Sequence, residues 1–344
     1  MNRLLEQMRE LTQLRGVSGR EEGVREYLIR SIEGHCDEYK VDPMGNLIVY
    51  KMGKKAGAKR VLFSAHMDEV GFIITHIAGD GMLHFETVGG ITAAVTAGRP
   101  VLVGDREIPG VIGTRPIHLL TEEERKEYAK IEDMRIDIGA KSREEAQKLV
   151  CPGDIATFIG PWRELGEDSI LAKAIDDRAG CALLLDMILG EELPYDCTFA
   201  FVVQEETGCA GSKAVAFSQR PDIAVAVEGT TAGDLPTAPE GRQVCRVGAG
   251  PVISFMDKGT IYPWDLYLKA VSIAEEAGIP YQTKEGVFGG NDARSYASGA
   301  GGAKVLAVSL PVRYLHSANT LMGVKDVGDT QRLLALLAQK LPEG

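Results

Sequence analysis

The chain has 344 residues, of which 44% are hydrophobic and 25% charged, and its formal net charge is -11. This length is enough for two domains, or for one large domain that carries an insert. The negative charge argues against nucleic acid or an anionic membrane as the main partner, because both are bound by clustered Lys and Arg. No uninterrupted apolar run approaches the roughly 20 residues that span a bilayer, so we expect no membrane partner.

The first segment predicts an amphipathic helix, because apolar residues recur at helical spacing from Leu4 to Leu11. It has neither the charged-then-apolar pattern nor the cleavage site of a secretory leader. The six cysteines are scattered and form no Cys-x-x-Cys pair. Such spacing is typical of reduced thiols and not of a disulfide framework or a zinc knuckle. These features predict a cytoplasmic protein.

The next elements lead to a buried strand. Ser18 and Glu21 have the spacing of a capping box, which predicts the start of a second helix that runs to Ile32. Residues 41–50 predict two short strands around a turn. Residues 61–65 form a continuous apolar run, the pattern of a strand that is covered on both faces.

The pattern of apolar and turn residues changes over the following ninety or so residues. Short β-rich stretches alternate with Gly and Pro turns, and one helix is predicted within 121–130, capped by Thr121 with Glu124 three residues on. This pattern predicts a small β-barrel or sandwich at 72–160, inserted into an α/β catalytic domain made of residues 1–71 and 161–344.

After the insert, strands and helices alternate again. The predicted strands are 197–203, 223–227 and 305–310, and the predicted helices are 177–189, 262–277 and 330–341. Histidines and carboxylates follow these strands or open the first helix: His66, Asp68, Asp176, Asp177, Glu205, Glu206, Glu228 and His316. In open α/β sheets the site lies beyond the carboxyl ends of the strands, so we expect these side chains to converge in one crevice.

This set of side chains favours a centre with two metals. Imidazole and carboxylate bind borderline divalent ions, and two ions about 3.5–4 Å apart need a carboxylate that bridges them. With Asp176 as the bridge, Glu206 and His316 would complete one ion's site, and His66 and Glu228 the other's. Three carboxylates against two dications leave a net charge of +1, which can hold a bridging hydroxide as the nucleophile. Zn or Co is expected, with Mn as the alternative.

Two neighbouring residues have predicted roles in this chemistry. Glu205 precedes the ligand Glu206 and is free to act as general base, taking a proton from water and passing it to the leaving amine. Asp68 is expected to hydrogen-bond the second nitrogen of His66. Each residue alone has a structural explanation, since Asp176 and Asp177 could simply cap a helix. Their joint occurrence at strand ends favours a metal site.

Seven segments spread over nearly the whole chain resemble the tetrahedral (TET) and glutamyl aminopeptidases, a family of dinuclear metallo-aminopeptidases. They are AHMDEVGF (65–72), GVIGTRPIHLL (110–120), RIDIGAKSREEA (135–146), AKAIDDRAGC (172–181), VVQEETGCAGS (202–212), VEGTTAGDLP (227–236) and RYLHS (313–317). The resemblance implies that His66, Asp176, Glu206, Glu228 and His316 hold two metals and that Glu205 is the base.

The same resemblance implies further properties. The fold would be a mixed-sheet, zinc-exopeptidase-like α/β domain, and the insert would be a β-rich dimerisation domain. The subunits would assemble into a homo-oligomer of up to twelve copies. The peptide bond between Asp176 and Asp177 would be cis.

Two segments depart from the family pattern, residues 289–297 and the ANTLMG that follows RYLHS at 318–323. Residues 289–297 read GGNDARSYA, where the family more often has Gly-Gly-Thr-Asp-Ala-Gly. Four residues are expected to border the pocket for the substrate's first side chain: Asn291, Asp292, Arg294 and Arg313. A guanidinium at Arg294 could pair with an acidic side chain and so favour N-terminal Glu or Asp. If Arg294 points to solvent, the pocket would accept neutral residues.

The sequence therefore predicts an enzyme that removes N-terminal residues from short peptides. A two-metal carboxypeptidase or deacylase is the main alternative, but its extra domain typically enters later than here, where the insert lies between His66 and Asp176. A glycosidase needs opposed carboxylates and aromatic sugar platforms, and only 6% of the residues are aromatic. A non-catalytic peptide-binding scaffold would lack a ligand or the base, and none is missing.

Overall fold

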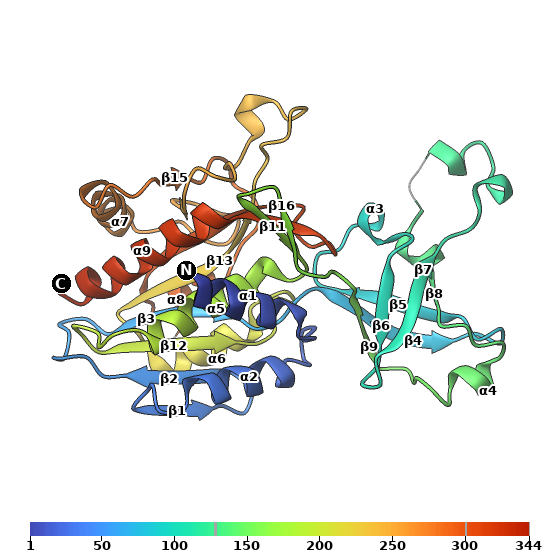
Figure 1. The fold of residues 1–344 in the computed structure, drawn as a ribbon, viewed down its shortest axis with the longest axis horizontal. Helices are drawn as coiled ribbons and strands as arrows, with labels where there is room; N and C mark the ends of the chain where they lie inside the picture. Colours follow the sequence, from blue (N-terminus) through green and yellow to red (C-terminus); the bar gives the residue numbers. More distant parts are fainter. Residues whose placement is uncertain (127–128, 300, 344) are drawn as a thin grey trace.

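Figure 1 shows the computed structural model of the protein, which describes residues 1–126, 129–299 and 301–343. A large mixed sheet flanked by helices forms one part, and a small closed barrel lies beside it. This arrangement confirms the predicted fold class, a mixed-sheet α/β fold with a separate β-rich part. No helix among the described residues is long and apolar enough to cross a membrane.

The large sheet has four parallel strands at its centre, in the order β12-β3-β13-β16. Antiparallel strands extend it on both sides. In spatial order the strands are β1 (Glu38–Val41), β2 (Leu47–Lys51), β12 (Cys197–Val202), β3 (Val61–His66), β13 (Ile223–Thr231), β16 (Lys304–Arg313), β17 (Thr320–Gly323), β11 (Ser169–Ala172) and β10 (Arg163–Leu165). In addition, β14 (Val252–Ile253) pairs with β16, and β15 (Gln282–Thr283) pairs with β14. The central strands match the apolar runs that the sequence predicted.

Helices cover both faces of the central strands, which explains why these strands are apolar throughout. In β3, Phe63 packs into the core cluster on one face and Leu62 into the cluster on the other. One face is covered by α1 (Asn2–Gln13), α2 (Glu22–Ile32), α5 (Ile175–Leu189), α7 (Trp264–Glu276) and α9 (Val324–Lys340), and the other by α6 (Ala210–Gln219) and α8 (Ala293–Ser298). Each buried Leu or Phe stabilises this sandwich by about 1.5–3 kcal/mol.

The barrel is antiparallel and has its own core. Its strands close in the order β4 (Gly71–Ile77), β5 (Leu83–Val88), β8 (Arg135–Asp137), β7 (Ile108–Gly113), β6 (Pro100–Val103) and β9 (Ile155–Phe158), with short helices α3 (Ala93–Thr96) and α4 (Arg143–Ala146) between them. The ring of Phe72 meets Phe85 and Phe158 edge-on, at centroid distances of 5.1 and 5.0 Å. Apart from Ala318, which follows β16, the buried residues of this core cluster all come from the barrel and its connections.

Two local predictions were wrong. The Ser18–Glu21 capping box does not form, because the Ser18 hydroxyl donates to Asp68 at 2.6 Å instead. In place of a helix within 121–130, the described residues show only a single 3-10 turn, Glu124–Lys126, and residues 127 and 128 lie outside the description. At the first place the hydroxyl that would cap the helix is bound by a carboxylate, and at the second the described residues 121–123 are exposed.

Buried charges tie the elements around β3 together. Arg178 on α5 has no exposed surface, and it donates to the main-chain oxygens of Met67 at 2.8 Å and Leu11 at 2.6 Å. Glu69 lies 2.8 Å from the ammonium of Lys173 and 3.5 Å from Arg178. Because a buried charge is unfavourable without partners, this network fixes the chain just beyond β3, where the site lies.

Candidate metal centre

The four parallel strands of the large sheet end at the same edge, and a cavity of about 370 Å³ lies there. It is lined by the side chains that the sequence placed at strand ends: His66, Asp176, Glu205, Glu206, Glu228 and His316. β3 supplies the first of these and α5 the second, while the segments after β12 and β16 and the strand β13 supply the rest. These side chains therefore converge beyond the carboxyl ends of the strands, as expected.

Asp176, Glu206 and His316 form the first group of candidate ligands. Their ligand atoms lie within 4.8 Å of one another. The Nε2 of His316 is 3.2 Å from Glu206 Oε1 and 3.6 Å from Asp176 Oδ2. Its Nδ1 faces the main-chain oxygen of Gly90 at 2.9 Å. This carbonyl comes from the loop after β5, so the barrel orients an imidazole that lies outside it.

His66 belongs to a second group of candidate ligands. Its Nε2 lies 3.4 Å from Asp176 Oδ1, as expected, and its ligand atoms lie close to those of Glu205 and Glu206. The predicted third member, Glu228, lines the same cavity but accepts a hydrogen bond from the Asn291 amide at 2.7 Å. That amide holds the Glu228 carboxylate on the side of the cavity formed by β13 and α8.

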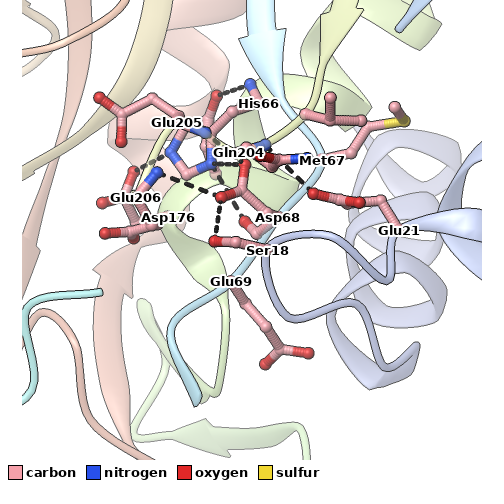
Figure 2. Close-up of polar contacts among 12 residues, drawn as sticks. Ser18, Glu21, His66, Met67, Asp68, Glu69, Asp176, Gln204, Glu205 and Glu206 are labelled. Atoms are coloured by element: carbon pink, nitrogen blue, oxygen red, sulfur yellow. Dashed lines mark hydrogen bonds and ion pairs between the residues drawn. The ribbon is translucent and has the colours of Figure 1, made fainter. Parts of the chain in front are cut away.

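Asp68 connects the loops that carry the candidate ligands, as Figure 2 shows. Its carboxylate accepts hydrogen bonds from the main-chain N–H groups of Glu205 at 3.0 Å and Glu206 at 3.1 Å. The Nδ1 of His66 lies 3.0 Å from the Asp68 main-chain oxygen and 3.4 Å from its carboxylate. Asp68 thus contacts His66 mainly through its carbonyl, while its buried carboxylate holds the Glu205–Glu206 segment.

The Asp176–Asp177 pair stands at the start of α5, and its peptide bond is cis, as the resemblance implied. Asp176 Oδ1 accepts a hydrogen bond from the Gly229 N–H at 2.9 Å. The Asp177 carboxylate is fully buried and accepts from the main-chain N–H of His66 at 3.1 Å and of Gly180 at 2.9 Å. Asp177 therefore fastens α5 to the end of β3, and Asp176 is left facing the cavity.

The electrostatics of the site are dominated by crowded, buried carboxylates. Burial raises the pKa of Glu228 to about 8 and that of Glu205 well above its usual range. Burial lowers the pKa of His316, but Asp176 and Glu206 outweigh it and raise that pKa to about 11. So many acidic groups in one buried place call for cations nearby.

The donor set fits divalent metal ions. Imidazole nitrogens and carboxylate oxygens are the ligands that Zn²⁺ and similar ions take, and two donors of one tetrahedral ion lie about 3.4 Å apart. The two oxygens of Asp176 face different histidines, at 3.4 Å for His66 and 3.6 Å for His316. Each of these spacings matches a pair of donors to a shared ion, with one carboxylate common to both pairs.

The four residues expected at the substrate pocket have different surroundings. Arg294 is exposed and lines the cavity. Asn291 and Asp292 are buried behind its wall, at 1% and 4% exposure. Arg313 forms a bidentate ion pair with Asp234, at 2.7 and 2.6 Å, and is not among the described residues that line the cavity.

The residues of the cavity wall that were not predicted from the sequence include Gly90, Cys209, Lys284 and Phe288. Lys284 is only 4% exposed and adds a cation among the acidic groups. It follows the two-residue strand β15, which has too few residues for an apolar pattern. Cys209 lies within the 202–212 segment, four residues after Glu205, and Phe288 directly precedes the 289–297 segment.

The chain is similar to known proteins over nearly its whole length. Residues 45–333 match the family model described as M42 glutamyl aminopeptidase. The chain is 30% identical to the glutamyl aminopeptidase of Lactococcus lactis subsp. cremoris, over 98% of this chain and 96% of that one, and 30% identical to the lysyl aminopeptidase of Pyrococcus furiosus, over 98% and 97%. The structure of the Pyrococcus horikoshii TET1 peptidase, described as assembling into a tetrahedron or a large octahedral shell, matches with a TM-score of 0.86 and 38% identity, over 98% of this chain and 99% of that one.

Proposed function

Because the chain belongs to the M42 glutamyl aminopeptidase family, it is an aminopeptidase, and we propose that it removes N-terminal residues from short peptides with the help of two divalent cations. The proposed ligands are His66, Asp176, Glu206, Glu228 and His316. Zn²⁺ or Co²⁺ suits this set of nitrogen and oxygen donors, with Mn²⁺ as the alternative.

One observation carries the proposal. Asp176 presents one oxygen to His66 and the other to His316, which is the arrangement that a bridging carboxylate between two ions requires. A helix cap would direct its carboxylate to the N–H groups of its own helix. The Asp176 carboxylate instead accepts from Gly229 on β13 and faces the cavity.

The chain's own residues suggest how the reaction proceeds. When bound, the cations would supply Lewis-acid chemistry, polarising the peptide carbonyl and making water more acidic. Glu205 lines the cavity and accepts a proton from the attacking water at its carboxylate, then donates that proton to the leaving amine. The Asp68 carboxylate holds the main chain of Glu205, which fixes the direction of its side chain.

The competing functions are less well supported. A carboxypeptidase or deacylase, a glycosidase and a silent scaffold all conflict with membership of an aminopeptidase family. To test the activity, the protein would be stripped with a chelator, and hydrolysis of leucyl and glutamyl anilides would be followed as each metal is restored. Turnover should disappear with the metal and return with it. Turnover that survives complete removal of metal would contradict the proposal.

Family membership leaves the preferred N-terminal residue open, since the chain is equally similar to a lysyl and a glutamyl enzyme. Lys284 and Arg294 are the lysine and arginine among the described residues that line the cavity. Lys284 is buried, so its attraction for a carboxylate is weakly screened by water, whereas Arg294 is exposed. We therefore favour N-terminal Glu or Asp as the substrate class.

Replacing Lys284 by methionine tests this preference. The change keeps much of the side chain's volume and removes its charge. A hydrogen bond to a charged group is worth about 1.5–3 kcal/mol, so kcat/KM for a glutamyl anilide relative to a leucyl anilide should fall about tenfold or more. Arg294→Gly should lower the same ratio less, because its guanidinium is exposed. Equal losses for both substrates would make Lys284 a counter-ion of the acidic cluster and not a specificity residue.

We further propose that residues 72–160 form a separate domain that mediates contacts between subunits of a homo-oligomer, up to a dodecamer. The apolar strand residues Val101, Val103 and Ile112 are fully buried inside the barrel and so are not free for such contacts. The support comes instead from the loop after β7, where Ile117 is 72% exposed and Leu119 62%. Two large apolar side chains so near each other on a surface indicate a contact site.

The double change Ile117→Asp and Leu119→Asp tests the oligomer. Two carboxylates cannot be desolvated at an apolar contact without a large cost, so we expect smaller particles by light scattering. Met52→Asp serves as the control, because Met52 is 64% exposed but lies outside the barrel. Wild-type protein that is already monomeric at micromolar concentration would overturn the proposed assembly.

A further inference from the structure

A third group of metal-ligating side chains lies at the wall of the same cavity, beside the five proposed ligands. It consists of Glu205, Cys209 and Asp292, whose ligand atoms all lie within 4.8 Å of one another. Cys209 and Asp292 are each only 4% exposed. Glu205 and Cys209 also line the cavity. The group is therefore reachable from the cavity, yet most of it is shielded from bulk water.

The spacing of its sulfur and oxygen atoms suits a shared cation. The Cys209 thiol donates a hydrogen bond to Glu205 Oε1, with 3.3 Å between Sγ and Oε1. A sulfur at about 2.3 Å and an oxygen at about 2.1 Å from one tetrahedral Zn²⁺ lie about 3.6 Å apart. A cation could thus replace the thiol proton with only a small movement of either side chain.

Asp292 provides an independent sign that this group lacks a partner. Its Oδ1 is buried and has no hydrogen-bond partner among the described residues. Asp292 stands just before α8, but its side chain does not cap that helix. Leaving a buried carboxylate oxygen unpaired is unfavourable. A cation held between Asp292, Cys209 and Glu205 would satisfy it.

We propose that Glu205, Cys209 and Asp292 form a third, inhibitory site for a thiophilic divalent cation such as Zn²⁺, Co²⁺ or Cd²⁺. When the cation binds, the S–H bond breaks, the proton leaves to solvent and the Cys209 thiolate becomes a ligand. The Glu205 carboxylate then shares its electron pair with the cation and can no longer accept a proton from water. Binding itself is independent of the proposed reaction, whereas inhibition rests on Glu205 acting as its base.

The set of donor atoms distinguishes this site from the two-metal centre. None of the five ligands proposed above is a cysteine, so a bond between metal and sulfur reports the third site alone. A thiolate bound to Co²⁺ produces a charge-transfer absorption band in the near ultraviolet. This band gives a readout that does not depend on turnover.

The test titrates chelated wild-type protein with Co²⁺ and follows bound metal by elemental analysis, near-ultraviolet absorption and turnover. Two equivalents should restore turnover without the band. A third should produce the band and lower kcat by about 10²-fold or more, the usual worth of a general base. If the protein binds no more than two equivalents of Co²⁺ and never shows the band, the proposed third site is wrong. A third equivalent with the band but unchanged turnover overturns its inhibitory role.

Variants identify the ligands. Cys209→Ser removes the sulfur with little change of shape, so it should abolish the band and bind one ion fewer. Asp292→Asn should weaken the third ion at least about tenfold. Cys151→Ala is the matched control, because Cys151 also pairs with a carboxylate, that of Asp154 at 3.4 Å, but on the surface. A band that survives in Cys209→Ser or disappears in Cys151→Ala overturns the assignment. Failure of the first two equivalents to restore turnover would contradict the proposed function instead.

Discussion

Replacing Asp176 by asparagine is expected to release one or both cations and to abolish peptidase activity. The carboxylate faces two histidines through its two oxygens, so its loss weakens both ion sites at once. Changes in residues that only support a ligand lower metal affinity about 10–100-fold, and loss of a bridging ligand should exceed this. Elemental analysis after dialysis measures the effect directly.

Asp186→Asn is the matched control for this change. Asp186 lies on the same helix, α5. Its carboxylate accepts hydrogen bonds from Arg3 and Gln331, which are distant in sequence from the site residues. It should keep its full complement of metal and its turnover. If Asp176→Asn keeps both metals at full occupancy, Asp176 is a structural residue and the two-metal account is wrong.

The second large effect is expected for Glu205→Gln, which should keep both metals and lose turnover. The substitution keeps the shape of the side chain but removes its ability to accept a proton. We expect kcat to fall by about 10²–10⁴-fold, while KM changes little. The thermal unfolding midpoint should also stay close to that of the wild type, because Asp68 holds this segment through main-chain N–H groups.

The neighbouring Glu206→Gln should behave differently, although the two substitutions are identical and adjacent. Glu206 contacts His316 and belongs to both groups that contain a histidine. Its replacement should therefore reduce metal content as well as turnover. Glu205→Gln with near-normal turnover, or with loss of metal, would remove Glu205 from the role of base.

The convergence of the site could be predicted from sequence for a physical reason. The buried strands β3, β12, β13 and β16 are continuous apolar runs, and the residues that end a parallel strand must lie at one edge of the sheet. His66 and Glu206 follow from this rule without knowledge of any contact. The contact between Glu228 and the Asn291 amide does not follow from it, because Asn291 comes from a distant loop.

Two of the cavity residues that were not predicted from the sequence are brought to the site only by the tertiary fold. Gly90 reaches His316 across the boundary between the barrel and the large sheet, and Lys284 follows a strand of two residues. Neither position has a periodic pattern, so only the tertiary fold brings it to the cavity. Ser18 is the opposite case. Its local pattern is that of a capping box, but in the folded chain its hydroxyl binds Asp68 instead of capping the helix.

The central claim is that Asp176 bridges two divalent cations. An anomalous difference map from crystals grown with two equivalents of Zn²⁺ per subunit tests it most directly. We expect two peaks about 3.5–4 Å apart, one on each side of the Asp176 carboxylate, with His66 at one and His316 at the other. A single peak, or peaks that do not touch Asp176, would contradict it.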